Sequence, residues 1–395
     1  MSATDRTSAA CDFCGTPFDA AAYIPQGTRR GVAVHVCAGC GLVQSVCTKR
    51  EPQRIKTLST DADWGNVRHG KGVRFPFLRD MLERHVAWPE VARAIDIGSN
   101  RGDFVLWLAK QHQRVETWAV EPDSSVTGSY AELPGLRLFQ QRLEHVELPA
   151  EHFDLAFCSH TLEHADSGAG MLETMRRVLR PGGLLLLEIP NLAGICDADV
   201  VEEFFIDKHT LHFDRETLLD YLGNSGFEVL VGADDDDPLS ISLLLRRAGA
   251  KTSFHPRDGA SRATRNRAWI ASFADRLPRN RALLQRIVND KLQPLGKRQK
   301  VGYWGAGRIF DALVNYGGLH ATDIHCLVDS HLHGIVRETH GVLIERPEDL
   351  RIREPQVLVA LGRSAEELMA RKAYAMGIRH VVKFSELMGQ ARDLR

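Results

Sequence analysis

The sequence predicts an α/β protein in which a small cysteine-rich segment precedes two doubly wound units. Two C-x-x-C pairs stand close together near the N-terminus, strand-like runs alternate with Gly-rich turns and helical patterns over residues 91–247, and a second strand–turn–helix begins near residue 300. Strands that alternate with helices favour a largely parallel sheet covered on both faces. We therefore expect four segments, at residues 1–50, 51–248, 249–297 and 298–395.

The composition is that of a soluble globular protein. The 395 residues suffice for two or three domains, each with its own core. The formal net charge is −1, so no overall field favours nucleic acid or an anionic membrane. The N-terminus "MSATDRTSAA" lacks the apolar core of a signal peptide, and no apolar run approaches the ~20 residues that span a bilayer. We expect a cytoplasmic protein with reduced thiols, whose partner is a small molecule.

The first segment has the pattern of a structural zinc site. "CDFCG" and "VCAGCGLVQ" place two cysteine pairs 22 residues apart: Cys11 and Cys14, then Cys37 and Cys40. Tetrahedral zinc takes four such thiolates, and a site closed by four protein ligands is structural rather than catalytic. A redox pair is the alternative. Cys47 stays outside the set.

Residues 51–88 look helical and linking, and the alternating pattern follows them. We expect strands and helices in order, with an antiparallel hairpin and an acidic, exposed turn at the end. The strands are expected at 91–99, 116–122, 153–160 and 181–191, helices at 100–111, 171–180 and 215–226, and the hairpin at 227–247.

The turn "DIGSNRGDF" at residues 96–104 follows a strand and opens a helix, so its backbone amides can approach a ligand closely. Glu121 ends the next strand, where an acid can hold the two hydroxyls of a ribose. The glycines read G-x-x-x-G and lack the third glycine that seats a pyrophosphate on the helix. An adenosine without phosphate fits better, which points to S-adenosylmethionine.

The ordered motifs resemble those of class I S-adenosylmethionine-dependent methyltransferases, which have a Rossmann-like core. They are "AIDIGSNRGDF", "VEPD", "FDLAFCSHTLEH" and "VLRPGGLLLLEIPN". The flanks "CDFCG…CAGCGLVQ" and "GYWGAGRIF…LVDS" extend the resemblance to sugar C-methyltransferases, which act on nucleotide-linked deoxysugars. That family has an N-terminal zinc-binding domain and a second Rossmann-like domain at the C-terminus. Its usual "GSNDG" reads "GSNRG" here, with Arg101 in place of the acid.

The resemblance implies a set of site residues. The loop under the methionine moiety would be Gly98, Ser99, Asn100 and Gly102, with Asp96 orienting it. Glu121 would hold the ribose beside Pro122 and Asp123, Arg142 and Leu143 would lie near the adenine, and Ser159 and His160 beside the methyl group. A turn or cap role is the alternative for each polar residue, above all for Asp123.

A base is the other part that methyl transfer needs, because the acceptor often has to lose a proton. The stretch "EEFFIDKHTLHF" lies where sugar C-methyltransferases carry a Tyr-His-Glu-His motif, and aligned here it reads Ile-Asp-Lys-His, ending at His209. His209 is the candidate base, and Lys208 can stabilise an oxyanion. The lost Tyr and Glu leave open an O- or N-methyltransferase of a sugar or natural-product intermediate. His212 is better explained by packing.

"SHTLEH" adds His160, Glu163 and His164 after the fourth strand. A structural role is at least as good an interpretation as a catalytic one. Adjacent helical residues point apart, so Glu163 and His164 are poor joint metal ligands.

Residues 246–300 hold fifteen Lys or Arg against three Asp and no Glu. Their apolar spacing predicts a helix. A solvated linker is favoured over a positive wall facing an anionic substrate such as a nucleotide diphosphate.

The last segment opens with a dinucleotide-type turn, "GAGRIF", in which Phe310 stands where a third glycine would be. Together with Asp329, this turn is also compatible with another class of function, an NAD-dependent sugar-nucleotide oxidoreductase or a nucleotide-binding protein. The resemblance instead implies a domain that holds the substrate's nucleotide. His331, His333 and His340 fit a solvated loop better than a metal site.

Overall fold

A computed structural model of the chain describes residues 9–26, 28, 30–47, 75–124, 126–194, 199–200, 202, 204–232, 239–249, 258–334, 336–362 and 365–393. Residues 51–74 of the helical and linking stretch expected at 51–88, and the acidic turn at 233–238, lie outside the described residues. The described residues divide into two compact units, one within 9–194 and 204–272, the other within 199–202 and 273–393.

The first unit contains a seven-stranded sheet in the order β5-β4-β3-β6-β7-β10-β9. β10 runs antiparallel to both of its neighbours, and the other pairs are parallel. The predicted strands and the terminal hairpin are therefore confirmed. The strands are β3 (Arg93–Ile97), β4 (Glu116–Val120), β5 (Arg137–Phe139), β6 (Phe153–Ser159), β7 (Leu179–Pro190), β9 (Phe227–Gly232) and β10 (Ser240–Arg247).

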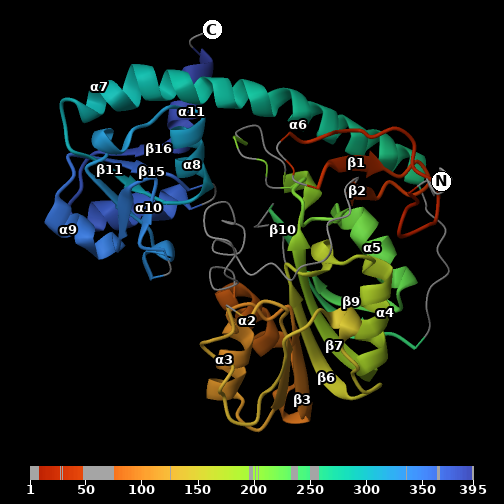
Figure 1. Ribbon diagram of the computed structural model, residues 1–395. Helices are drawn as coiled ribbons and strands as arrows, with labels where there is room; N and C mark the ends of the chain where they lie inside the picture. The colour runs from red at the N-terminus through yellow and green to blue at the C-terminus, as the bar shows by residue number, and fades with distance from the viewer. Residues whose placement is uncertain are drawn as a thin grey trace, which may run out of the picture. The chain divides into compact units, whose positions relative to one another are not determined.

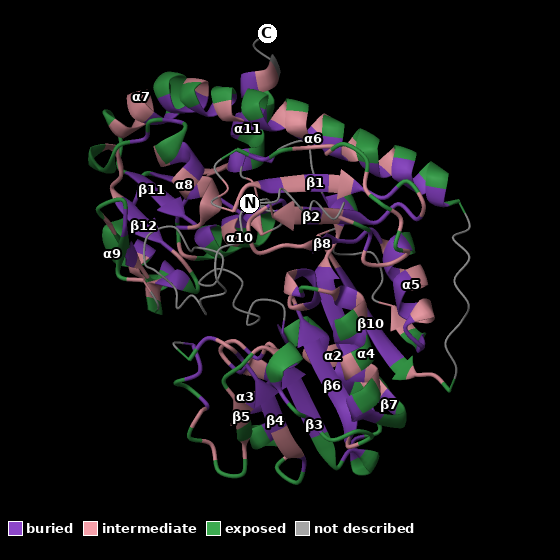
Figure 2. Ribbon diagram, turned by 45° about the vertical axis from the view of Figure 1, so that its right-hand side comes forward, coloured by how far each residue is buried: buried purple, intermediate pink, exposed green. Residues whose placement is uncertain are grey.

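Helices cover both faces of this sheet, α2 and α3 on one side and α4 and α5 on the other (Figure 1). Alternate residues of β6 serve the two sides, because successive side chains of a strand point opposite ways. Leu155 and Phe157 share a core cluster with α2 and α3, and Ala156 and Cys158 share one with α4 and α5. The helices are α2 (Phe75–His85), α3 (Asp103–Gln111), α4 (Gly168–Val178) and α5 (Arg215–Asn224). Burial on both faces explains the continuous apolar runs of the central strands (Figure 2).

The cysteine-rich segment is joined to this unit by a second, three-stranded sheet. β1 (Val32–Val36) pairs antiparallel with β2 (Val43–Cys47), which pairs antiparallel with β8 (Leu211–His212). Cys11, Cys37 and Cys40 belong to the same buried cluster as β6 and β7. The segment is therefore part of the first unit's core and holds the chain just before and within β8.

The predicted basic helix is confirmed as α6 (Gly259–Ile287), followed by a π-helical turn, η6 (Val288–Leu292), and α7 (Gln293–Gly296). Its first arginines are paired within the protein. Arg262 Nη2 lies 2.5 Å from Asp220 Oδ2, and Arg265 Nη1 lies 3.0 Å from Glu216 Oε2. These guanidiniums neutralise α5 rather than presenting charge to an anionic ligand.

Asn266 of α6 joins three parts of the first unit, and its replacement should lower the stability of that unit. The fully buried side chain donates from Nδ2 to Gly41 O at 2.9 Å and to Asp214 Oδ2 at 2.8 Å, and Asp214 in turn caps α5. We expect Asn266→Ala to lower the free energy of unfolding by about 1–3 kcal/mol in a urea titration, because buried acceptors lose their donor. Thr264→Ala, at an exposed position of the same helix, is the control. Equal effects of the two substitutions would contradict this role of Asn266.

The second unit contains a six-stranded sheet in the order β13-β14-β12-β11-β15-β16, parallel except for the β13–β14 pair. The strand-like runs "IHCLVDS" and "PQVLVALG" of the sequence form β12 and β15. The strands are β11 (Val301–Trp304), β12 (Cys326–Val328), β13 (Glu338–Thr339), β14 (Val342–Glu345), β15 (Val357–Ala360) and β16 (Val381–Lys383). The helices are α8 (Arg308–Asn315), α9 (Leu350–Arg353), α10 (Glu366–Ala375) and α11 (Phe384–Asp393). No helix in the described part of the chain is long and apolar enough to span a membrane.

Candidate active site

The predicted cofactor loop turns sharply between β3 and α3. Gly98, Asn100 and Gly102 all have positive φ, of 70°, 47° and 78°. Glycine adopts this conformation freely, and asparagine is among the few other residues that tolerate it. The amides of Gly98 and Ser99 donate to Val120 O at 2.8 and 3.1 Å, which holds the loop against the end of β4. The predicted loop residues thus lie together at the carboxyl edge of the sheet, where open α/β sheets bind ligands.

Glu121 follows β4 and fastens this loop. Its side chain is buried, with one oxygen accepting from Asn100 N at 2.7 Å and the other from Asp123 N at 2.9 Å. A carboxylate offers about four acceptor sites, so one such group can accept from loop amides and from ribose hydroxyls together. The burial of Asp123, directly beside it, agrees with a local structural role.

Tyr130 completes the loop, although no motif in the sequence pointed to it. Its hydroxyl lies 2.7 Å from Ser99 Oγ and donates to Asn100 O at 2.9 Å. A Cβ at Gly102 would lie 2.3 Å from the Tyr130 ring, so only glycine allows this packing. Burial raises the pKa of Tyr130, and the nearby charges of Asp96 and Glu121 add to the shift. The hydroxyl therefore stays protonated, as a donor to the loop.

Arg142 and Leu143 follow β5, at the start of the short helix η3 (Leu143–His145). Leu143 is buried, whereas Arg142 is paired with Glu144 at 3.0 Å and with Asp166 at 3.4 Å. A further bond from Arg142 Nη2 reaches His164 O at 3.4 Å. The adenine-side residues are thus connected to the segment that follows β6.

Ser159 ends β6 and His160 follows it, and both side chains lie beside the buried carboxylate of Glu188. Ser159 Oγ donates to Glu188 Oε2 at 2.7 Å, and His160 Nε2 lies 3.7 Å from the same oxygen. His160 has a φ of 47°, a conformation that is uncommon for histidine and often found at functional sites. Thr161 touches the cofactor loop, because a Cβ at Gly98 would lie 2.2 Å from Thr161 Oγ1. Glu188, on the neighbouring strand β7, was not singled out from the sequence.

Glu163, His164 and His209 come together from two segments. The first two lie in the 3-10 helix η4 (Leu162–His164), and His209 precedes β8. One ligand atom of each residue lies within 4.8 Å of those of the other two. The expectation that Glu163 and His164 point apart is wrong, since His164 Nε2 lies 3.8 Å from Glu163 Oε1.

His212 packs in the core. It is buried, its Nε2 lies 2.8 Å from Ser45 Oγ, and its ring packs against Phe205. Burial lowers the pKa of His212 to about 3, against an opposing effect of Glu163, so the ring is neutral. Lys208 contributes its carbonyl, which lies 3.0 Å from His164 Nδ1.

The cysteine cluster forms as the sequence predicts. Sγ of Cys11 lies 3.5 Å from that of Cys40, and Sγ of Cys14 lies 3.4 Å from that of Cys37. Gly15 and Gly41, both with positive φ, close identical turns by donating to Cys11 O and Cys37 O at 2.9 Å. Sulfurs of a tetrahedral zinc site with bonds of about 2.3 Å lie about 3.8 Å apart, so small shifts would admit the ion.

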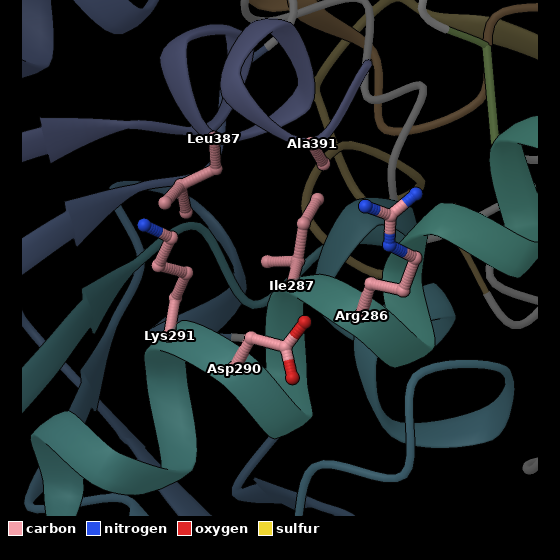
Figure 3. A pocket seen from close by; sticks show the side chains of 6 residues that line it. All are labelled: Arg286, Ile287, Asp290, Lys291, Leu387 and Ala391. Carbon is pink, nitrogen blue, oxygen red and sulfur yellow. The ribbon is translucent and has the colours of Figure 1, made fainter. Parts of the chain in front are cut away.

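In the second unit, Asp329 holds the "GAGRIF" turn. Its carboxylate accepts from the amides of Ala306, His331 and Leu332 at 2.8–3.0 Å. Within the described chain, groups that can hold a metal are the four cysteines and Glu163–His164–His209, so the histidines after Asp329 are not gathered around a metal position. A pocket between η6 and α11 has a volume of about 10 Å³, room for one water rather than a substrate (Figure 3).

Comparisons with known proteins agree with this geometry. The sequence model of a family described as "Methyltransferase domain" matches residues 72–231. A probable methyltransferase, ltbC, of Aspergillus luteorubrus is 28% identical over 205 residues, which cover 46% of this chain and 66% of that protein. Trans-aconitate 2-methyltransferase of Azoarcus sp. (strain BH72) is 30% identical over 122 residues, which cover 29% of this chain and 44% of that protein. The chain thus spans less than two thirds of the length of these curated relatives.

Solved structures of methyltransferases are also similar. An S-adenosylmethionine-dependent methyltransferase from Mesorhizobium loti has a TM-score of 0.35 and 21% identity, covering 44% of this chain and 97% of that chain. A putative one from Listeria monocytogenes has a TM-score of 0.36 and 11% identity, covering 42% of this chain and 96% of that chain. The family match, together with the parallel sheet and its glycine turn, shows that the chain carries a class I S-adenosylmethionine-dependent methyltransferase domain.

Proposed function

We propose that the whole protein methylates a small anionic metabolite, such as a nucleotide-linked sugar, with S-adenosylmethionine as the donor. The observation that carries the proposal is the contact between the two halves of the site. The loop at Gly98 packs directly on Thr161, next to His160 and the cluster of Glu163, His164 and His209. Donor-binding residues and candidate proton acceptors therefore share one edge of the sheet.

The cofactor supplies a methyl group on a sulfonium centre, and the protein has to hold it, orient the acceptor and take a proton. Gly98, Ser99, Asn100 and Gly102 would lie against the methionine moiety, and Asp96 would support that loop. Glu121 would accept from the ribose hydroxyls, with Pro122 beside it. Arg142 and Leu143 would border the adenine, and Ser159 would lie near the methyl group.

Two imidazoles are candidates for taking the acceptor's proton. His209 directs Nδ1 at Phe204 O, 2.9 Å away, so Nδ1 carries the proton of the neutral ring and Nε2 the lone pair. His160 lies 3.4 Å from Glu163 Oε1 and 3.7 Å from Glu188 Oε2, and these carboxylates stabilise the charge that it gains. Lys208 is the candidate for stabilising an oxyanion.

O- or N-methylation of a sugar or natural-product intermediate is the second candidate. It is favoured because the Tyr and Glu of the C-methyltransferase motif are Ile206 and Lys208 here. A hydroxyl or amine acceptor needs one base and no stabilised enolate.

The flanking segments complete the proposal. The four cysteines would bind structural zinc, and we place the enzyme in the cytoplasm, where such thiols stay reduced. The second unit would be a Rossmann-like domain that helps to hold the acceptor's nucleotide. Its three amide bonds to Asp329 support a structural role for that acid rather than a role in binding NAD.

Calorimetric titration with S-adenosylmethionine tests the first step. We expect Glu121→Ala, and the more conservative Glu121→Gln, to raise the dissociation constant at least about tenfold, because charge-assisted bonds to the ribose are lost. Glu116→Ala, at the opposite end of β4, is the matched control and should bind as the wild type does. Absence of binding by the wild type, or equal affinity in all variants, would overturn the proposal.

A further inference from the structure

The cluster of Glu163, His164 and His209 has the composition of a metal centre. Two imidazoles and a carboxylate bind divalent transition metals in many enzymes, and such a set leaves positions open for water or substrate. The ligand atoms lie within 4.8 Å of one another although they come from two segments 45 residues apart. Proximity alone does not make a metal site, so the orientation and the charge of each group must also suit a cation.

Both histidines are held as metal-ligating histidines usually are. His164 Nδ1 lies 3.0 Å from Lys208 O, and His209 Nδ1 lies 2.9 Å from Phe204 O. A carbonyl oxygen only accepts, so each ring donates from Nδ1 and carries its lone pair on Nε2. A backbone carbonyl on the far nitrogen is the common outer support of a ligating imidazole.

Glu163 is a buried acid whose two oxygens differ in their contacts, since Oε1 lies 3.4 Å from His160 Nδ1. The residue is 2% exposed, and none of the described residues hydrogen-bonds to its Oε2. A buried carboxylate with one oxygen that lacks a hydrogen-bond partner is costly, and a cation beside that oxygen would offset the cost.

The two segments are also locked to each other. Thr210 donates its amide to Glu163 O at 2.8 Å and its hydroxyl to Ala165 O at 2.6 Å. With the bond from His164 to Lys208 O, these contacts fix His209 opposite Glu163. These hydrogen bonds make the cluster a fixed part of the first unit's structure, unlike exposed side chains that happen to lie close together.

We propose that Glu163, His164 and His209 bind a divalent transition-metal cation, separate from the four-cysteine site, and that this cation holds an oxygen of the methyl acceptor. Imidazole ligands favour zinc, cobalt, nickel or iron over magnesium and calcium, which prefer oxygen. The inference rests on the proposed methyl transfer and narrows its substrate to acceptors with a hydroxyl or carbonyl oxygen. Since Thr161 packs on Gly98 and stands two residues before Glu163 in the chain, we expect the bound oxygen to lie on the donor's side of the site.

With the cation bound, the imidazoles of His209 and His160 would have different roles. It would take the Nε2 lone pair of His209, so His209 would act as a ligand, whereas without a cation it remains a candidate base. A bound cation stabilises the deprotonated oxygen of the acceptor, which makes that oxygen a better nucleophile at neutral pH. The released proton would pass to His160, which no ligand role requires.

The test is a titration of the full chain with Co²⁺ after its cysteine site has been filled with zinc. We expect one further equivalent of Co²⁺, bound with the weak visible absorption of nitrogen and oxygen ligands and without thiolate charge-transfer bands. His164→Ala and Glu163→Gln should each raise the dissociation constant of this Co²⁺ at least about tenfold. A loss of metal affinity of that size is already common when a residue that supports a ligand is replaced. His164 is 37% exposed at its side chain, and the two bonds from Thr210 still join the segments without it, so its truncation should leave the fold intact.

The chain offers a close control. Residues 143–145 repeat the tripeptide Leu-Glu-His in another 3-10 helix, η3, and His145 there is exposed and outside the cluster. His145→Ala should bind Co²⁺ as the wild type does. The inference is overturned if no further equivalent binds, or if binding survives both His164→Ala and Glu163→Gln. Titration of the same samples with S-adenosylmethionine reports on the proposed function separately, because it needs no metal.

Discussion

Cys40→Ser is expected to abolish binding of the proposed structural zinc and to loosen the first unit well beyond the cysteine segment. Cys40 is fully buried and shares a core cluster with strands β6 and β7. A structural zinc contributes about 10–16 kcal/mol in zinc-finger peptides, and removal of one of four ligands forfeits a large part of such a contribution. The unit should therefore unfold at a clearly lower denaturant concentration.

The effect should reach the candidate base through β2. Val43 and Gln44 of β2 pair with His212 and Leu211 of β8, and Ser45 N donates to Thr210 O at 2.8 Å. Loss of the metal frees this edge, and with it the stretch that holds His209. We expect amide hydrogen exchange at residues 208–212 to accelerate, whereas exchange in β3 and β4 changes less.

Cys47→Ser is the matched control for this prediction. Cys47 ends β2, is partly buried and lies outside the cluster of four sulfurs. The Cys47→Ser variant should keep the zinc content and the amide hydrogen-exchange pattern of the wild type. Elemental analysis that finds the same zinc content in Cys40→Ser, or exchange at 208–212 that equals the wild type, would refute a structural zinc at these cysteines.

The parts of the site that the sequence predicted are those encoded locally. The loop from Gly98 to Gly102 and the acid at Glu121 each follow a strand, and the order of strands in a doubly wound sheet brings them to one edge. The four cysteines are likewise recognisable because two short turns carry all four of them. Such features depend on residues a few positions apart, which a single sequence displays.

The parts that escaped prediction depend on contacts between distant segments. Tyr130 lies about 30 residues from the loop that it supports, and Glu188 reaches Ser159 from a neighbouring strand. Nothing in the surrounding sequence distinguishes either residue from an ordinary core residue. Glu163 and His164 were misjudged for another reason. The rule that adjacent residues diverge describes the directions of their Cβ atoms, whereas the ends of these two long side chains still come within 3.8 Å of each other.

Gly98→Ala is expected to have the largest effect on the donor site. Gly98 has a φ of 70°, and a Cβ there would lie 2.2 Å from Thr161 Oγ1 and 2.6 Å from Thr161 Cγ2. Both atoms belong to a short β-branched side chain that cannot swing away freely. The loop would have to move from Thr161, and the amides of Gly98 and Ser99 would lose their bonds to Val120 O. We expect S-adenosylmethionine affinity to fall more than about tenfold and stability to fall by about 2–4 kcal/mol, from conformational strain and overpacking together.

Gly182→Ala separates these two causes. Gly182 has a similar φ of 77°, but no atom lies within 4 Å of a Cβ built there, and the turn is far from the loop in sequence. It should show the conformational cost alone, about 1 kcal/mol, with normal cofactor affinity. A double substitution, Gly98→Ala with Thr161→Ala, removes the two closest atoms and should recover part of both losses, because substitutions in contact are not additive. Gly98→Ala could instead match Gly182→Ala in cofactor affinity, measured by calorimetry, and in stability, measured in denaturant. The close packing of the cofactor loop on the segment after β6 would then not be what joins donor and acceptor in this enzyme.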